Sequence, residues 1–205
     1  SSHVRTHGHP PTEPWEYGES FLQAFRQADN MRYELMPYIY TQAKLSTEQG
    51  LPMLRALFVE FPDDPGSWLV DDEYLFGSDL LVAPLFESVA ERDVYLPPGD
   101  WIDYQTGLTY AGGWHTIAAG EIPVIVLVRS GSVIPHIGLA QSTQDLDWSQ
   151  IELKVYATDR REPAFGQLYL PGAEGVKGLT VNPANRRLVQ NPFGSQVTFS
   201  VSTNQ

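Results

Sequence analysis

From Asp79 to the C-terminus the sequence consists of short apolar runs separated by proline and glycine, and this texture limits the fold more than any other feature. The runs before residue 140 are DLLVAPLF, RDVYLPPG, DWIDY, HTIAAGE and IPVIVLVRSGSVIP. Short apolar runs with turn residues between them are typical of strands joined by tight connections. We therefore predict an antiparallel β-sandwich over this part of the chain.

A polar stretch, QSTQDLDWSQ, begins at residue 141 and separates these runs from a last set of strand-like segments. Those segments are IELKVYA, GQLYLPG, KGLTVN, RRLVQN and QVTFSVS. Their spacing predicts a small distal β domain over residues 141–205, which is either complete or truncated.

Residues 19–49 have the periodicity of a helix instead. The apolar side chains that recur every three to four residues are Phe21, Phe25, Ala28, Leu35 and Ile39. Gly50 ends this pattern. Pro37 removes a backbone donor inside it and crowds the carbonyl of Tyr33, so we expect a kink within residues 32–40.

The run from Leu51 to Phe61 is apolar at nearly every position, so periodicity does not separate a buried strand from a short buried helix. We favour the short helix. Arg32 lies in the apolar stripe of the preceding helix, and we expect it to pair with Asp63 or Asp64 rather than to act in catalysis.

Two acidic clusters, one at Asp63 and Asp64 and one over residues 71–73, raise the question of a catalytic carboxylate pair. In hydrolases that use such a pair on sugars, the two carboxylates lie ~5–5.5 Å apart for retention of configuration or ~6.5–9.5 Å apart for inversion. Neighbouring residues of a strand point to opposite faces, so neither cluster forms such a pair by itself. Capping and turn formation explain both clusters more simply.

A series of aromatic residues follows in the strand-like region: Tyr95, Trp101, Tyr104, Tyr110 and Trp114. Flat aromatic faces would suit stacking on sugar rings. Because these residues lie inside strand-like runs, we favour a role in the core or between domains and keep the sugar platform as the alternative.

The net charge of −12 makes nucleic acid and anionic membrane surfaces poor partners, whereas neutral glycans remain compatible with it. No apolar run approaches the ~20 residues of a membrane-spanning helix. Cysteine is absent, which excludes thiol chemistry but leaves the compartment open. No phosphate-binding or dinucleotide-binding glycine motif occurs, so no cofactor is predicted.

Arg5 and His7 lie two residues apart near the N-terminus and are followed by Gly8. In a strand their side chains share a face, and the glycine frees the backbone to turn. A neutral imidazole both donates and accepts a hydrogen bond, which suits a sugar site, while a guanidinium fixes carboxylates. A loop or packing role for His7 is the alternative. His3, His7 and His9 alternate, but without a matching acidic motif they make a weak zinc site, so no metal is predicted.

The order of segments SHVRTHG, PW, RYELMPYIY, LPMLRALFVEFPDDP, DDEYLFGSDLLVAPLF and VYLPPGDWIDY resembles glycoside hydrolase family 31 over roughly residues 1 to 135. The resemblance is greatest to the bacterial α-xylosidase branch, with the α-glucosidases next. Gly8 after His7, and the SH-x-R before it, differ from the Arg-Asn-His-Asn pattern of many α-glucosidases.

This resemblance implies an α+β fragment: the last strand and helix of a (β/α)8 barrel over residues 1–75, then a proximal β-sandwich over 76–140 and the distal β domain over 141–205. A complete barrel needs ~250 residues, so most of it would lie elsewhere. The exposed end of such a barrel predicts either a homo-oligomer formed through the helix of residues 19–49 or disorder of the first ~20 residues.

The resemblance also implies the activity of a retaining α-glycoside hydrolase on α-linked oligosaccharides. The catalytic aspartates of the family belong upstream of the His7 motif, so no catalytic residue is expected in this chain, which alone would be inactive. His7 and Arg5 would bind substrate. The alternative is a non-catalytic β-rich module that binds carbohydrate or assembles with another polypeptide.

Overall fold

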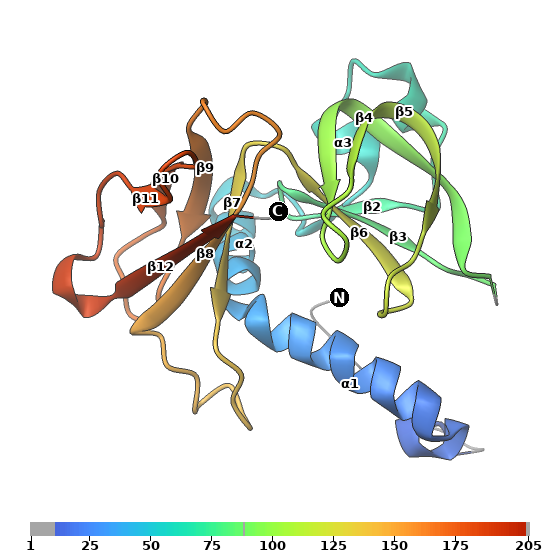
Figure 1. Cartoon of the computed structure of the whole chain (residues 1–205), viewed down its shortest axis with the longest axis horizontal. Coiled ribbons are helices and arrows are strands. Elements are labelled where there is room, and N and C mark those ends of the chain that lie inside the picture. The colour runs from blue at the N-terminus through green and yellow to red at the C-terminus, as the bar shows by residue number, and fades with distance from the viewer. Residues whose placement is uncertain (1–10, 88, 204–205) are drawn as a thin grey trace.

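The structure is a computed structural model that describes residues 11–87 and 89–203. Within these residues the chain forms two six-stranded sheets that lie side by side, with a broken helix running across them (Figure 1). The β-rich architecture predicted for the C-terminal part is confirmed. Turn and loop segments rich in glycine and proline connect the strands, as the sequence texture indicates.

The first sheet is antiparallel throughout and has the order β1-β2-β3-β6-β4-β5. Its strands are β1 (Leu54–Arg55), β2 (Tyr74–Phe76), β3 (Leu80–Pro84), β4 (Glu91–Asp103), β5 (Thr109–Ala118) and β6 (Val124–Arg129). In β3 and β6 nearly every side chain is buried, because both faces of the sheet are covered. This explains why these segments read as continuous apolar runs rather than alternating ones.

The two faces of the first sheet belong to two different apolar clusters. Leu81 of β3 lies in a core with Leu127, Val94, Trp101 and other residues of the same sheet. Leu80, one residue earlier, lies in a second core that also includes residues of the helix and of the second sheet. Successive side chains of a strand point to opposite faces, so a single strand supplies both cores.

The second sheet has the order β11-β10-β9-β7-β8-β12. Its strands are β7 (Ser132–Ile137), β8 (Gln150–Tyr156), β9 (Ala164–Leu168), β10 (Lys177–Asn182), β11 (Arg187–Leu188) and β12 (Thr198–Thr203). Unlike the first sheet it is mixed, because β12 runs parallel to β8 and β7 runs parallel to β9. The sequence texture did not predict these parallel pairs.

The change of sheet falls within a tight turn, since β6 ends at Arg129 and β7 begins at Ser132. Strands β1 and β2, which come before residue 77, pair within the first sheet. The proposed division of the chain into residues 1–75, 76–140 and 141–205 stays a prediction.

The expected long helix is two helices, α1 (Glu19–Glu34) and α2 (Met36–Gln49), which break at Leu35 inside the predicted kink region. Pro37 lies in the first turn of α2, where its missing N–H has no cost. Gly50 ends α2 in the left-handed conformation, with φ of 73°. None of the residues of α1 is buried, in contrast to α2.

The short helix predicted within the run of residues 51–61 is present as α3 (Leu57–Glu60), although the same run also contributes β1. Three 3-10 helices complete the structure: η1 (Pro14–Tyr17), η2 (Pro65–Trp68) and η3 (Gly194–Gln196). The predicted turn at Asp63, Asp64 and Pro65 is confirmed, because the Asp64 side chain caps η2 by accepting from the backbone N–H of Gly66.

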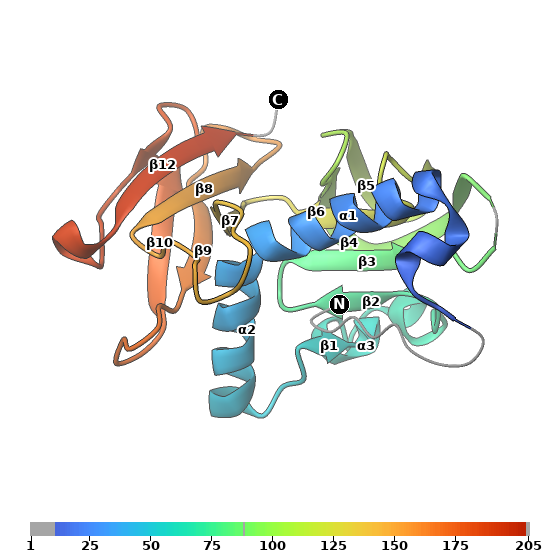
Figure 2. The ribbon, with the colours of Figure 1, turned by 90° about the horizontal axis from the view of Figure 1, so that it is seen from below.

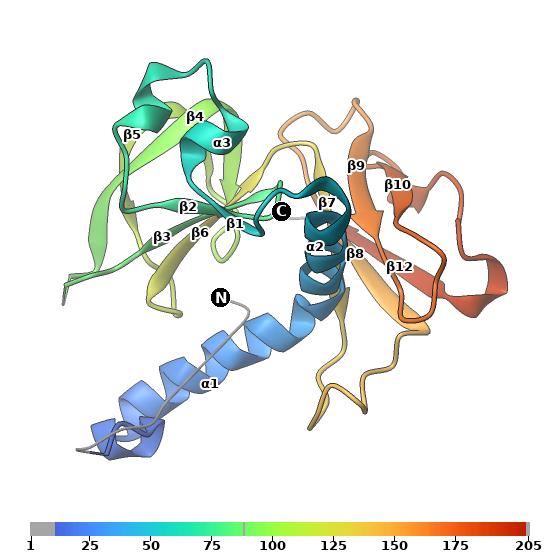
Figure 3. The same ribbon diagram turned by 180° about the vertical axis from the view of Figure 1, so that it is seen from behind.

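Helix α2 holds the two sheets together. Figures 2 and 3 show it between them. Toward the first sheet, the Tyr38 hydroxyl donates to the carbonyl of Phe76 at 2.8 Å and accepts from the backbone N–H of Asp79 at 3.1 Å. Toward the second, the Thr41 hydroxyl accepts from the backbone N–H of Tyr169 at 2.8 Å. These polar contacts of one helix add to the apolar core that the two sheets share in fixing their relative position.

Candidate functional site

The residues predicted to bind sugar, Arg5 and His7, lie outside the described part of the chain, as do His3 and His9. Their roles stay a prediction. The first element that follows them is the 3-10 helix η1, in which Pro14 is buried while Trp15 and Tyr17 are exposed. Gly18, with φ of 89°, redirects the chain from this turn into α1.

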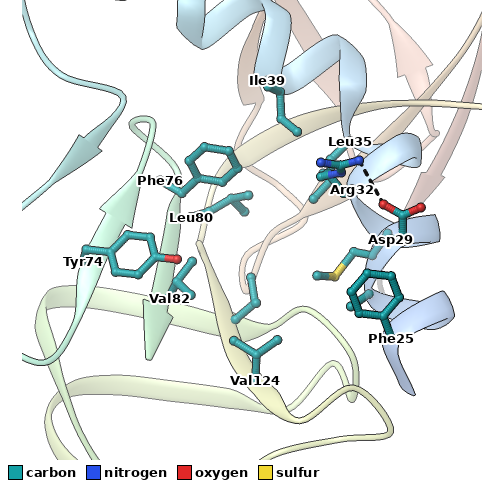
Figure 4. Close-up of a pocket in the computed structure, with 13 residues that line it drawn as sticks. Phe25, Asp29, Arg32, Leu35, Ile39, Tyr74, Phe76, Leu80, Val82 and Val124 are labelled. Carbon is teal, nitrogen blue, oxygen red and sulfur yellow. Dashed lines mark ion pairs between the residues drawn. The ribbon is translucent and has the colours of Figure 1, made fainter. Parts of the chain in front are cut away.

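A groove runs between α1 and the first sheet (Figure 4). It encloses about 230 Å³ and is lined by apolar side chains of α1, α2, β2, β3 and β6, including Phe25, Leu35 and Phe76. A charged pair also lines it, formed by Arg32 and Asp29 at 3.0 Å. The lining offers few groups that could bind sugar hydroxyls, so the groove has the character of a packing surface. The predicted homo-oligomer stays a prediction.

The predicted partner of Arg32 is wrong. Its guanidinium pairs with Asp29, three residues earlier on the same helix, rather than with Asp63 or Asp64. A residue three positions away on a helix is always within reach, whereas a partner in a distant turn depends on tertiary packing.

The first acidic cluster is built into the fold through Asp64. Its carboxylate accepts hydrogen bonds from the Ser67 hydroxyl at 2.7 Å and from the Tyr95 hydroxyl at 2.9 Å. Although burial acts in the opposite sense, these bonds and the one from Gly66 lower the pKa of Asp64. Burial and the bond to Asp64 raise the pKa of Tyr95 to about 12. Asp64 is thus an ionised structural group.

The second acidic cluster was expected to act in capping and turns, and for Glu73 this is wrong. The Glu73 side chain is buried, and its Oε1 accepts from the backbone N–H of Tyr95 at 2.8 Å. The Arg92 guanidinium forms an ion pair with Asp72, and its nitrogen lies 3.8 Å from Oε1 of Glu73. Among the described residues Oε2 has no hydrogen-bond partner, and burial raises the pKa of Glu73 to about 7.

Glu73 predicts a specific pH dependence of stability. Because its folded pKa of about 7 exceeds its ordinary value of 4.5, the folded state binds the proton more tightly, and stability falls as pH rises through this window. We expect Glu73→Gln to remove this fall, so that the variant gains about 2–3 kcal/mol relative to the wild type between pH 4 and pH 8. Urea unfolding at a series of pH values measures it.

The matched control for this prediction is Glu91→Gln, since Glu91 is exposed at the start of β4. It should leave the pH profile of the free energy of unfolding as in the wild type. Parallel pH profiles for the wild type and Glu73→Gln would show that the buried carboxyl does not titrate in this window.

His136 was not singled out in the sequence, where it lies inside the apolar segment IPHI. Its ring is buried, Nδ1 donates to the carbonyl of Ile134 at 2.9 Å, and Nε2 accepts from the Tyr104 hydroxyl at 2.7 Å. Burial, with a contribution from nearby Lys154, lowers the pKa of His136 to about 3. Nδ1 is used within β7 and Nε2 is used between the sheets, so this neutral imidazole is a structural group.

The aromatic series divides between core and surface. Trp101 is fully buried and donates from Nε1 to the carbonyl of Pro97 at 2.9 Å, and Tyr104 stacks between His136 and Tyr156. The core role is confirmed for these two residues. Trp114 on β5 is instead exposed to 62%.

Over residues 11–87 and 89–203, no group of three or more His, Asp or Glu side chains is arranged to hold a metal ion. Over the same residues, no helix is long and apolar enough to cross a membrane.

Two family models match the chain. Residues 1–42 match the TIM-barrel domain of glycosyl hydrolases family 31, and residues 50–134 match the C-terminal domain of glycosyl hydrolase family 31. The first match includes the Arg5 and His7 motif, η1, α1 and the first half of α2. The second covers the first sheet and the start of β7.

Curated relatives agree with these matches. The chain is 35% identical over 134 residues to α-glucosidase 2 of Bacillus thermoamyloliquefaciens, covering 64% of this chain and 17% of the relative. It is 34% identical over 157 residues to an α-xylosidase of Saccharolobus solfataricus, covering 75% of this chain and 22% of the relative. The chain therefore spans about a fifth of the length of these relatives.

Solved structures share the fold. A family 31 dextranase of Flavobacterium johnsoniae superposes with a TM-score of 0.79 at 28% identity, covering 88% of this chain and 24% of the dextranase. A family 31 α-xylosidase of Xanthomonas citri gives 0.78 at 27% identity, covering 96% of this chain and 23% of the xylosidase. Sequence motifs, family models and fold agree, and the chain belongs to glycosyl hydrolase family 31.

Proposed function

We propose that this chain is the C-terminal part of a retaining α-glycoside hydrolase, an α-xylosidase or α-glucosidase that acts on α-linked oligosaccharides. The observation that supports this most is the succession of a barrel match over residues 1–42 and a C-terminal-domain match over residues 50–134. Relatives that match over most of this chain are named α-glucosidase and α-xylosidase.

In this proposal His7, and with it Arg5, contributes to the sugar-binding subsite, and the two sheets brace the barrel. Of the two acidic clusters, Asp64, Asp72 and Glu73 are engaged by Tyr95 and Arg92 in structural contacts. The catalytic aspartates are expected in the part of the barrel outside these 205 residues. The chain by itself is therefore expected to be inactive.

The preference for an α-xylosidase over an α-glucosidase rests on the residues around His7, namely SH-x-R before it and Gly8 after it. The residues that select a pentose or a hexose are expected mostly outside this chain. Relatives of both kinds match this chain with similar identity, 35% for the α-glucosidase and 34% for the α-xylosidase. The substrate assay below therefore includes both sugars.

The test compares the 205-residue chain with the protein encoded by the complete open reading frame that contains it. Both are assayed for release of 4-nitrophenol from the α-xyloside and the α-glucoside. Because loss of a whole catalytic group has cost ~10⁶-fold in a protease, the isolated chain should release nothing above background. Measurable turnover by the isolated chain would contradict the proposal, as would an inactive complete protein.

A further inference from the structure

One exposed tryptophan belongs to the turn that Asp64 caps, and another lies on strand β5. Trp68 at the end of η2 is exposed to 59%, and Trp114 on β5 is exposed to 62%. In Figure 1 the segment that follows α3 lies beside β4 and β5 at the top of the first sheet. Exposed aromatic groups that gather in one place mark interaction surfaces.

Trp68 is held in place although it is exposed. Its ring stacks on that of Phe58, with centroids 4.7 Å apart and an angle of 17° between the planes. Its Nε1 donates to the carbonyl of Pro62 at 2.9 Å. The polar edge of the indole is thus used inside the protein, and the surface that faces solvent is apolar and flat. A fixed ring loses little conformational entropy when a ligand stacks on it.

Trp114 is joined to the same surface through Tyr95. The two residues are register partners on β5 and β4, and their ring centroids lie 5.4 Å apart. The Tyr95 hydroxyl donates to Asp64, and the backbone of Gly66 lies directly on its ring, where a Cβ would approach within 2.1 Å. Two aromatic pairs, Phe58 with Trp68 and Tyr95 with Trp114, are therefore joined through the turn of Asp64 and Gly66. We call these four residues the aromatic surface.

The polar groups beside the aromatic surface are acceptors and hydroxyls. Asp63 is exposed next to Asp64, and Asp93 accepts from the Thr116 hydroxyl at 2.6 Å on the strand pair that carries Trp114. Together with the net charge of −12, these carboxylates disfavour anionic ligands. They suit a neutral ligand that has many hydroxyl donors and flat C–H faces.

We propose that the aromatic surface binds a neutral oligosaccharide, whose pyranose rings stack on Trp68 and Trp114 while their hydroxyls donate to the neighbouring carboxylates. This site uses residues other than Arg5 and His7 and requires no hydrolysis. Aromatic stacking of this kind tolerates different sugars, because each pyranose ring has an apolar face. The surface would hold a glycan chain beside the enzyme that acts on it.

The test titrates the 205-residue chain with maltotetraose, isomaltotetraose and a xyloglucan heptasaccharide. Calorimetry and tryptophan fluorescence measure the binding. We expect saturable binding of at least one of them and none of oligogalacturonate. Trp68→Ala and Trp114→Ala should each weaken binding by about tenfold or more, as loss of an aromatic anchor does. The control Phe165→Ala, on the second sheet and also exposed, should bind as the wild type does.

Two outcomes would overturn this proposal. One is the absence of saturable binding of all three neutral sugars. The other is light scattering that shows a self-associated chain whose assembly, rather than glycan binding, is lost in Trp68→Ala. If Trp68→Ala fails to fold, Trp114→Ala and the protection of wild-type tryptophans from acrylamide by the sugars decide the question, since unprotected tryptophans contradict stacking.

Discussion

Replacing Trp101 by alanine is expected to lower the free energy of unfolding by about 3–5 kcal/mol, which is the usual cost of deleting a buried aromatic side chain. Trp101 has no exposed surface and belongs to the core of the first sheet. Its ring meets that of Phe61 at 6.3 Å, and the Arg129 guanidinium lies 5.7 Å from its centroid. The variant also leaves the buried carbonyl of Pro97 without its donor.

Trp114→Ala is the matched control, because it deletes the same side chain from the outer face of the same sheet. Most of that indole is in water, so its loss should cost less than about 1 kcal/mol. Urea unfolding followed by circular dichroism measures both variants. Equal losses for Trp101→Ala and Trp114→Ala would mean that the core of the first sheet is not where the structure puts it.

Gly77→Ala is expected to cost about 3 kcal/mol, for two separate reasons. Gly77 turns the chain between β2 and β3 with φ of 70°, a conformation that costs an alanine about 1 kcal/mol or more. In addition, a Cβ here would lie 2.4 Å from the Tyr38 hydroxyl and 2.6 Å from the Gln42 side chain. Tyr38 is buried and already makes two hydrogen bonds, so relief of the clash would disturb the contact of α2 with the first sheet.

Gly50→Ala separates these two contributions. Gly50 has φ of 73°, nearly that of Gly77, but no atom lies within 4 Å of the place where its Cβ would be. It should therefore show the backbone cost alone, about 1 kcal/mol. If both variants lose the same stability in thermal and urea unfolding, the close approach of α2 to the turn at Gly77 is not present in solution.

The features that the sequence predicted are those that depend on neighbours along the chain. Pro37 and the apolar stripe placed the break in the helix within residues 32–40, and it occurs at Leu35. Gly50 marked the helix end, and the Asp-Asp-Pro segment marked the turn that Asp64 caps. In each case the cause is a backbone preference or a hydrogen bond that spans a few residues.

The features that the sequence did not predict depend on packing between distant segments. Strands β8 and β12 pair in parallel although three other strands lie between them in the sequence. No residue pattern within either strand specifies this pairing. The burial of Glu73 depends on β4, since its carboxylate meets the backbone of Tyr95, 22 residues away. In the sequence Glu73 follows two aspartates and precedes β2, a pattern that indicates a turn residue. Its burial becomes evident only when β4 is placed beside it.

The candidate sites divide in the same way. His7 and Arg5 were predicted from a motif and from the resemblance to the family, and they lie outside the described residues. The aromatic surface could not be predicted from the sequence. Phe58 lies in a run whose periodicity does not indicate which side chains are exposed, and Trp68 lies in the turn that follows. The packing of η2 on β4 is what brings the turn at Asp64 and Gly66, which carries Trp68, onto the ring of Tyr95.

We propose that this chain belongs to a retaining α-glycosidase of family 31 whose activity requires the rest of the barrel. Proton NMR can follow the first sugar that the protein of the complete reading frame releases from α-linked xylosyl and glucosyl substrates. We expect the α-anomer of xylose or glucose as the first product, and no release by the 205-residue chain alone. Release of the β-anomer first, or hydrolysis by the isolated chain, would contradict it.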